Sequence, residues 1–207
     1  MTKRCEEKKY RQFYSTALGT KILEYETRFV VEKVQGYKNV LSIGCGPALL
    51  EERLQQLHPG MNIIGLDHSK EMIEQLSKKI SIVYGDAQYL AFKDNSFDVV
   101  LYVTSLEFIT NIQKTLGETN RVLKQNGVLL ILMLNPNSEY FQEKYNHNTS
   151  YIRKNIKHTN INKIKNVISQ YFIIKNQEYV LAIIGKEIIC AEDQHFACLF
   201  VVEGKKR

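Results

Sequence analysis

Two glycines and two aspartates stand where they could hold a ligand. Gly44 and Gly46 interrupt an aliphatic run that is typical of a strand, and a helical pattern follows them directly. Glycine tolerates a positive φ and leaves no side chain in the way, so a ligand can lie against such a loop. Asp67 and Asp86 each end a later strand-like run. A carboxylate at the end of one strand can accept hydrogen bonds from ribose hydroxyls, and one at the next can bind the amino group of adenine.

The helix after the glycines adds to this interpretation. Pro47 fits the first helical position, where its missing N–H costs nothing. The free N–H groups at the start of a helix point at whatever lies across the preceding loop. The order of strand, glycine turn and helix therefore predicts the first unit of a doubly wound sheet, with the ligand at the carboxyl end of the strand.

The absence of a third glycine from the loop narrows the choice of ligand. The dinucleotide fingerprint has a third glycine where Leu49 stands, which makes a nicotinamide cofactor the weaker alternative. S-adenosylmethionine has no phosphate to neutralise and carries a sulfonium cation, so it suits a carboxylate-rich site better than a pyrophosphate does. Asp67 and Asp86 also have a purely structural alternative, as strand-end caps or turn formers.

Strands and helices alternate along most of the chain. Strands are expected at 39–43, 62–66, 81–84, 97–102 and 128–134. Helices are expected from Lys21 to Gln35, from the glycine turn to about Leu57, from Ser69 onward with a buried stripe of Met72, Ile73, Leu76 and Ile80, and from about Asn111 to Leu123. This alternation predicts an α/β fold with a Rossmann-like, mostly parallel sheet.

The last third of the chain has a different character. Residues 138–170 are rich in Asn, Lys and Tyr and predict two irregular helices. Two further strand-like runs, 171–184 and 195–202, have no helix between them and predict an antiparallel terminal pair. The sheet should then hold about seven strands, in a single domain of residues 1–207. Residues 1–36 form a helical cover in that domain, and residues 138–170 form a variable cover on the substrate side.

Composition sets further limits. The chain has 207 residues, of which 44% are hydrophobic and 24% charged, as in a soluble globular protein. It has no apolar run long enough to span a bilayer, and its charged first residues do not predict a signal peptide. Its four cysteines, Cys5, Cys45, Cys190 and Cys198, have neither CxxC nor metal-ligand spacing. We therefore expect reduced thiols, a cytoplasmic location, no membrane and no metal.

At this point the sequence resembles the class I S-adenosylmethionine-dependent methyltransferases, and most closely the small type 11 members. The likeness covers about residues 10–135 and includes a leading segment, Tyr14 to Gly19, before the glycine loop. The other segments that support the likeness are Val40 to Gly46, Asp67, Gly85-Asp86-Ala87, Phe97 to Val100, Ser105-Leu106-Glu107 and Gly117 to Val128. The resemblance implies transfer of a methyl group from S-adenosylmethionine to an acceptor, most simply a small molecule.

The resemblance also implies a role for each cofactor-binding residue. The glycine loop would line the methionine part, the ends of the second and third strands would hold the adenosine with His68 at the border of the ring, and the segment after the fourth strand would face the transferable methyl. Tyr14 would close over the cofactor. These residues are Tyr14, Ser42, Gly44, Cys45, Gly46, Asp67, His68, Asp86, Ala87, Ser105 and Leu106.

One position departs from the family. An acidic residue usually stands two before the first glycine, and here it is Ser42. Ser42 can hydrogen-bond the ammonium group of the cofactor but cannot pair with it as a charge. Glu107 is a candidate to compensate.

The acceptor side is less defined. Tyr10, Glu107, Tyr140 and Tyr145 are candidate substrate residues from their position in the family. The net charge is +6, and residues 144–175 contain basic residues and no carboxylate. That stretch fits a small anionic acceptor, an RNA acceptor or simply a solvated helix. A protein that binds the cofactor without catalysis is a further alternative.

No catalytic residue is singled out. Methyl transfer from a sulfonium is an in-line displacement that depends on alignment and exclusion of water. A general base is needed only when the attacking atom carries a proton that leaves late.

Overall fold

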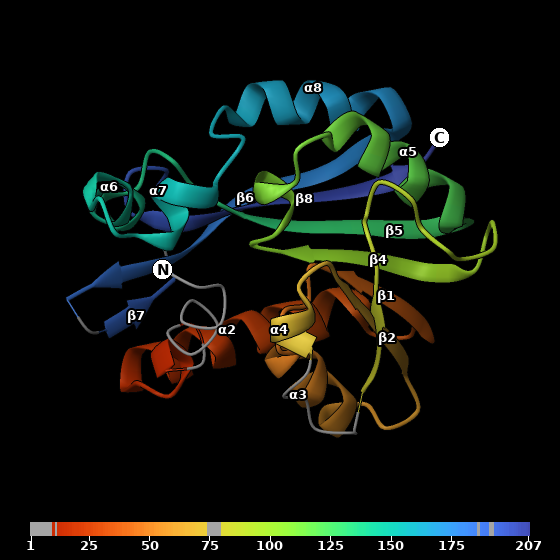
Figure 1. Cartoon of the computed structure of the whole chain (residues 1–207), viewed down its shortest axis with the longest axis horizontal. Coiled ribbons are helices and arrows are strands. Elements are labelled where there is room, and N and C mark those ends of the chain that lie inside the picture. Colours follow the sequence, from red (N-terminus) through yellow and green to blue (C-terminus); the bar gives the residue numbers. More distant parts are fainter. Residues whose placement is uncertain (1–9, 11, 74–79, 186, 191–192) are drawn as a thin grey trace.

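An eight-stranded sheet runs through the protein, and helices cover both of its faces (Figure 1). The computed structural model describes residues 10, 12–73, 80–185, 187–190 and 193–207. The strand order is β3-β2-β1-β4-β5-β8-β6-β7. The strands are β1 (Asn39–Ile43), β2 (Asn62–Asp67), β3 (Ser81–Tyr84), β4 (Phe97–Val103), β5 (Leu123–Leu134), β6 (Phe172–Ile184), β7 (Glu187–Ile189) and β8 (Ala197–Lys206).

The first five strands are parallel to one another, and β8 runs antiparallel to both β5 and β6. The predicted α/β fold and its antiparallel terminal pair are therefore confirmed. The order reverses direction between β1 and β4, and in such sheets ligands bind in the crevice at that switch point.

Two layers of helices enclose the sheet. The helices are α2 (Ala17–Val34), α3 (Leu49–Leu57), α4 (Lys70–Ile73), η1 (Leu106–Phe108), α5 (Ile112–Val122), α6 (Glu139–Asn146), α7 (Tyr151–Asn155) and α8 (Ile161–Tyr171). The apolar sides of α2 and α3 pack on one face of the sheet, and those of α5 and α8 pack on the other (Figure 1). Among the described residues, no helix has the length and apolar character needed to cross a bilayer.

Strand β1 lies at the centre of these layers. Its side chains alternate between the two faces, as a strand dictates. Leu41 and Ile43 join the core under α5, while Val40 joins the core under α2. Ser42 points to the same side as Val40 and is only 2% exposed. A polar side chain is thus buried at the heart of the α2 side.

Several elements differ from the expectations; among them, α2 begins at Ala17 rather than Lys21, and β8 ends at Lys206 rather than Val202. Residues 139–171 form three helices rather than two, and the short strand β7 was not predicted. Gly185, at φ +64°, makes the turn that folds β7 back on β6. Strand β5 begins at Leu123, earlier than expected, because Leu123 already pairs with Phe97 of β4.

Two predicted segments fall partly outside the described residues. The helix that starts near Ser69 is described only to Ile73, so Leu76 lies outside. Of the rest of the predicted buried stripe, Ile80 is buried, whereas Met72 and Ile73 are only half-buried. The helical cover at 1–36 is described from residue 12, with Tyr10.

Helix α2 is tied to strands that come late in the sequence. Lys21 forms an ion pair with Glu187 of β7 at 2.7 Å. Lys33 pairs with Glu178 of β6 at 3.0 Å and with Glu203 of β8 at 3.5 Å. The first described helix and the antiparallel strands therefore form one supporting unit.

Candidate functional site

The glycine loop after β1 has two glycines with positive φ and different surroundings. Gly44 has φ +74° and Gly46 has φ +54°. A Cβ on Gly44 would lie 2.5 Å from the Cβ of Ser105, whereas a Cβ on Gly46 would meet no atom within 4 Å. Gly44 is therefore required for packing between loops, and Gly46 borders open space that a ligand can occupy.

Asp67 ends β2 and holds this loop in place. Its Oδ2 accepts the Gly46 N–H at 2.8 Å, and its Oδ1 accepts the Ser69 N–H at 2.8 Å. The residue is 7% exposed. The structural role as a cap is thus present, yet each carboxylate oxygen keeps a second lone pair for a ligand hydroxyl. His68 is exposed next to it, with Nδ1 3.6 Å from Asp67 Oδ1.

Asp86 and Ala87 follow the neighbouring strand. Strands β2 and β3 pair in parallel, with Asp67 opposite Tyr84, so Asp86 lies two residues beyond the same edge of the sheet. The exposed Asp86 side chain accepts the Gln88 N–H at 2.9 Å, and Ala87 is buried. The structure thus places both aspartates at the carboxyl edge, as the sequence predicts.

Two buried carboxyl groups line a small cavity behind the loop. Glu26 of α2 and Glu51 of α3 are each 3% exposed and share this cavity of about 30 Å³ with Ser42. The Ser42 hydroxyl donates to Glu51 Oε1 at 2.5 Å. Burial raises the pKa of Glu26 to about 8 and that of Glu51 to about 7. In the described part of the chain, no basic side chain pairs with either carboxyl group or lines the cavity.

Neither glutamate was predicted, although one carried a signal. Glu26 lies four residues from Ile22 and four from Val30, so it occupies the apolar stripe of α2. A charged residue inside such a stripe is buried, and buried charges need a reason. Glu51 gave no comparable signal, because its burial follows from how α3 packs on β1.

Tyrosines gather around Glu26. Tyr10 and Tyr14 line the cavity with their ring centroids 5.0 Å apart. Burial raises the pKa of both phenols, and the charge of Glu26 adds to the effect. Tyr140 of α6 also interacts electrostatically with Glu26, and burial raises its pKa to about 12. Tyr145 instead stacks on Phe141, with centroids 5.4 Å apart.

The segment after β4 contributes differently from the expectation. The Ser105 hydroxyl donates to the Ile43 carbonyl at 2.7 Å. Leu106 has its side chain in the core under α5 and does not line the cavity. Val103 and Thr104 line it instead, and Thr104 has the unusual φ of +45°.

Glu107, the residue expected to compensate for the missing acid, does not line the cavity, and the carboxyl group that contacts Ser42 is that of Glu51. Glu107 Oε1 accepts the Leu134 N–H at 2.9 Å, and its Oε2 is buried with no hydrogen-bond partner among the residues that the structure describes. Burial raises its pKa to about 7. Its carbonyl accepts the N–H groups of Lys157 and His158, which joins it to the segment before α8.

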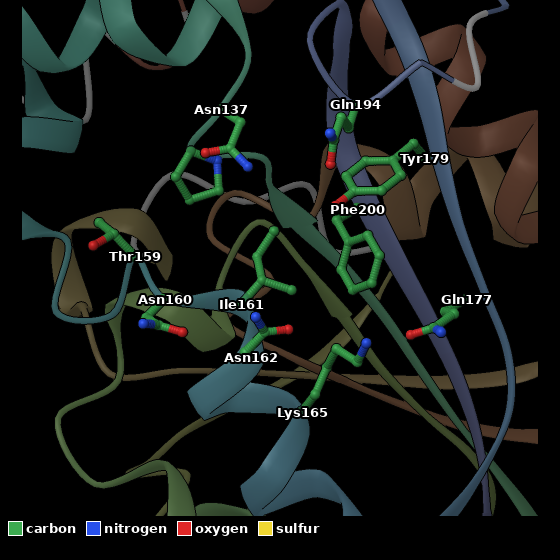
Figure 2. A pocket seen from close by; sticks show the side chains of 11 residues that line it. Asn137, Thr159, Asn160, Ile161, Asn162, Lys165, Gln177, Tyr179, Gln194 and Phe200 are labelled. Carbon is green, nitrogen blue, oxygen red and sulfur yellow. The ribbon is translucent and has the colours of Figure 1, made fainter.

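A second, larger hollow of about 640 Å³ lies between α8 and strands β6 and β8 (Figure 2). Its described lining is mostly uncharged and polar, with two aromatic rings and Lys165 as its basic residue. The rings of Tyr179 and Phe200 are 4.8 Å apart. This hollow has more room than the cavity at Glu26, but none of the predicted cofactor residues lines it. The candidate site is therefore the one at the glycine loop. The basic stretch 144–175 contributes Lys165 to the lining of the second hollow and no residue to the lining of the cavity at Glu26.

Comparison with known proteins agrees with this geometry. Residues 41–131 match the family model described as a methyltransferase domain. The chain is 31% identical over 107 residues to the malonyl-[acyl-carrier protein] O-methyltransferase of Legionella pneumophila, covering 49% of this chain and 38% of the relative. It is 33% identical over 111 residues to the demethylmenaquinone methyltransferase of Thermotoga maritima, covering 52% and 48%. The chain thus spans about half or less of the length of these relatives.

A solved structure extends the likeness to the whole fold. It is an S-adenosylmethionine-dependent methyltransferase, described as a possible histamine N-methyltransferase, from Thermotoga maritima. The two structures superpose with a TM-score of 0.77 at 20% sequence identity, over 97% of this chain and 95% of that one. At this identity the likeness concerns the fold.

Proposed function

We propose that this chain belongs to the class I S-adenosylmethionine-dependent methyltransferases and transfers a methyl group from S-adenosylmethionine to a small-molecule acceptor. The observation that carries the proposal is the charge of the site. Glu26, Glu51 and Asp67 lie around the glycine loop, and no basic side chain lines the cavity in the described part of the chain. A pyrophosphate would meet like charge there, whereas a sulfonium ligand with an ammonium group meets opposite charge.

The remaining residues fit the rest of that ligand. Asp67 keeps lone pairs for the two ribose hydroxyls, and Asp86 with Ala87 stands one strand further along the same edge for adenine. The open space at Gly46 accommodates the chain that joins sugar and sulfur. When bound, S-adenosylmethionine supplies a methyl group on a positively charged sulfur, which is activated for displacement.

The contribution of the protein is alignment and exclusion of water. Tyr10 and Tyr14 cover the cavity beside Glu26, and the enclosed space left there is only about 30 Å³. These rings limit the access of water to the part of the ligand that lies at Glu26, while alignment of the methyl group with the acceptor depends on the loops outside this cavity. No residue is assigned as a general base, because the attacking atom of the acceptor decides whether one is needed.

The small-molecule acceptor is supported by the relatives. Two of them are named as a demethylmenaquinone methyltransferase and a malonyl-[acyl-carrier protein] O-methyltransferase. The alternatives are an RNA acceptor, a protein acceptor, or binding of the cofactor without catalysis. The test must distinguish these from a small-molecule acceptor.

Two measurements test the proposal. A ligand at about 100 times its Kd stabilises the folded state by about 2.7 kcal/mol, which raises Tm by roughly 5–10 °C for a chain of this size. We expect S-adenosylhomocysteine to give this shift and NAD⁺ to give none; the opposite result would refute the proposal. Incubation with labelled S-adenosylmethionine and fractionated metabolites, RNA or protein should then place the label in the metabolite fraction, where mass spectrometry identifies the product.

A further inference from the structure

We propose that Glu26 and Glu51 together form a two-carboxylate subsite that receives the ammonium group at the amino-acid end of S-adenosylmethionine, and that they release a proton when it binds. The inference rests on the proposed cofactor and assigns a role to two residues that the glycine-loop pattern does not contain.

The geometry places both side chains around one point. Glu26 comes from α2, Glu51 comes from α3, and both line the cavity behind Gly44. Ser42 occupies the position where a carboxylate is expected, and its hydroxyl donates to Glu51 at 2.5 Å. The carboxylate that β1 lacks is thus supplied by the helix that follows it, at the end of a hydrogen bond from the serine.

The charge around the pair calls for a cation. Among the residues that the structure describes, the titratable groups that act on Glu26 are the phenols of Tyr10, Tyr14 and Tyr140 and the carboxyl group of Glu51. None of them can supply a positive charge. A buried carboxylate without a cation is costly, so a cation that enters the cavity gains more attraction than it would at an exposed site.

The surroundings of Glu51 are acidic as well. In the described part of the chain, the charged or titratable groups that act on it are Asp67, Glu52, Glu26, the phenol of Tyr10 and the thiol of Cys45. The raised pKa of both glutamates has burial as its main cause, and each is raised further by a neighbouring carboxyl group. Two such groups in one cavity do not both ionise readily, so the pair holds a proton near neutral pH.

The cavity has the size of an ammonium group. A volume of about 30 Å³ is enough for one or two groups of the size of water, and too small for a sugar or a base. The adenosine must then lie outside it, over Gly46 and Asp67, where the space is open. The ammonium is the one part of the ligand with both the size and the charge for the cavity.

Proton release follows from the same arrangement. Binding of the ammonium favours the ionised form of the pair and lowers the pKa of the glutamates below their raised values in the free protein. Below about pH 7 the ligand must therefore displace a proton, so affinity falls as pH falls through the range of the raised pKa values and rises toward about pH 8.

The decisive test compares two ligands on matched variants. S-adenosylhomocysteine carries the ammonium group, and 5′-methylthioadenosine has the same nucleoside without the amino-acid part. In calorimetry, Glu26→Gln and Glu51→Gln should each raise the Kd of S-adenosylhomocysteine at least tenfold. The Kd of 5′-methylthioadenosine should change less than threefold. Glu24→Gln makes the same substitution on the exposed side of α2 and should change neither.

A second measurement needs no variant. Titration of the wild-type chain with S-adenosylhomocysteine, in buffers of different ionisation enthalpy, should show release of about one proton at about pH 7. A Kd that stays constant between about pH 6 and pH 8 overturns the inference. The inference is also overturned if the Gln variants lose the same affinity for both ligands, or if they lose affinity for neither. These results leave the proposed cofactor standing, whereas a wild-type chain that binds neither ligand refutes the cofactor and the subsite together.

Discussion

A methyl group on Gly44 would lie 2.5 Å from the Cβ of Ser105, which shows that the loop after β1 and the loop after β4 are in direct contact. Ser105 also donates its hydroxyl to the carbonyl of Ile43 at 2.7 Å. The two loops border the switch point of the sheet, and their contact fixes how they lie relative to each other. A ligand there meets a preformed surface.

The two glycines of the loop should respond differently to alanine. Gly44→Ala adds strain at φ +74° and a clash with Ser105, and should lower the free energy of unfolding by about 2–4 kcal/mol. Gly46→Ala meets no protein atom and should cost only the strain of about 1–2 kcal/mol, but its methyl group enters the ligand space. Urea unfolding and calorimetry with S-adenosylhomocysteine should separate the two effects. Equal stability of both variants would contradict the loop contact.

Asp67→Ala should make the binding free energy of S-adenosylhomocysteine less favourable by a few kcal/mol, because the two ribose hydroxyls lose a charged, buried acceptor. The same change removes the acceptor of the Gly46 and Ser69 N–H groups, so some loss of stability accompanies it. Calorimetry measures the affinity, and thermal unfolding verifies that the variant is folded at the chosen temperature. Asp193→Ala, on an exposed loop, is the control. Unchanged affinity in Asp67→Ala would show that the ribose lies elsewhere.

Glu107 should make stability depend on pH. Burial raises its pKa from 4.5 to about 7, so between these values the native state holds a proton that the unfolded chain has lost. The free energy of unfolding therefore falls as pH rises through this window, by up to about 1.4 kcal/mol per pH unit for one group. Glu107→Gln keeps an acceptor for the Leu134 N–H and should flatten that part of the slope. An identical pH profile in the variant, measured by urea unfolding, would show that Glu107 is ionised in the native state throughout.

Replacement of Arg121 even by lysine should lower the stability of the protein. Its guanidinium donates to the carbonyls of Leu90 and Phe92, each at 2.8 Å, and to the carboxylates of Glu118 and Asp94. These bonds hold the segment that leads from β3 to β4 against α5. Lysine cannot reproduce the planar fork, so Arg121→Lys should lower stability by roughly 2–3 kcal/mol.

The control for that change is Arg53→Lys. Arg53 lies 3.9 Å from Glu24 at a partly exposed site, where an ion pair contributes little. Thermal unfolding should show a Tm several degrees lower for Arg121→Lys and nearly unchanged for Arg53→Lys. Similar values for both would mean that the fork of Arg121 does not hold the segment in solution.

Most of the parallel sheet could be predicted from the sequence, since strand and helix periodicities are strong there. The run from Val128 to Leu134 is apolar throughout, as a strand buried on both faces should be. The helices after β5 are harder to recognise, because their sequences are polar. Their capping residues are visible in retrospect: Ser138 accepts the Phe141 N–H, and Asn160 accepts the Lys163 N–H. Strand β7 is too short for its pattern to be distinguished.

The site could be predicted in part for a similar reason. Gly44, Gly46 and Asp67 follow directly from strand ends, whose position the local sequence determines. Glu26 and Glu51 come from helices, where a glutamate usually faces solvent. Their burial depends on how α2 and α3 pack on β1, which is a tertiary relationship that helical periodicity indicates only for Glu26.

Helix α2 shares one apolar core cluster with β6 and β8, and Lys21 and Lys33 add ion pairs to β6, β7 and β8. During synthesis on the ribosome, the helix that carries Glu26 emerges first, and the strands that anchor it emerge more than a hundred residues later. A growing chain therefore has the glycine loop well before it has a firmly seated acidic helix. We expect nascent chains halted before β6 to lack cofactor affinity, even though every residue that we propose to contact the cofactor has already been translated.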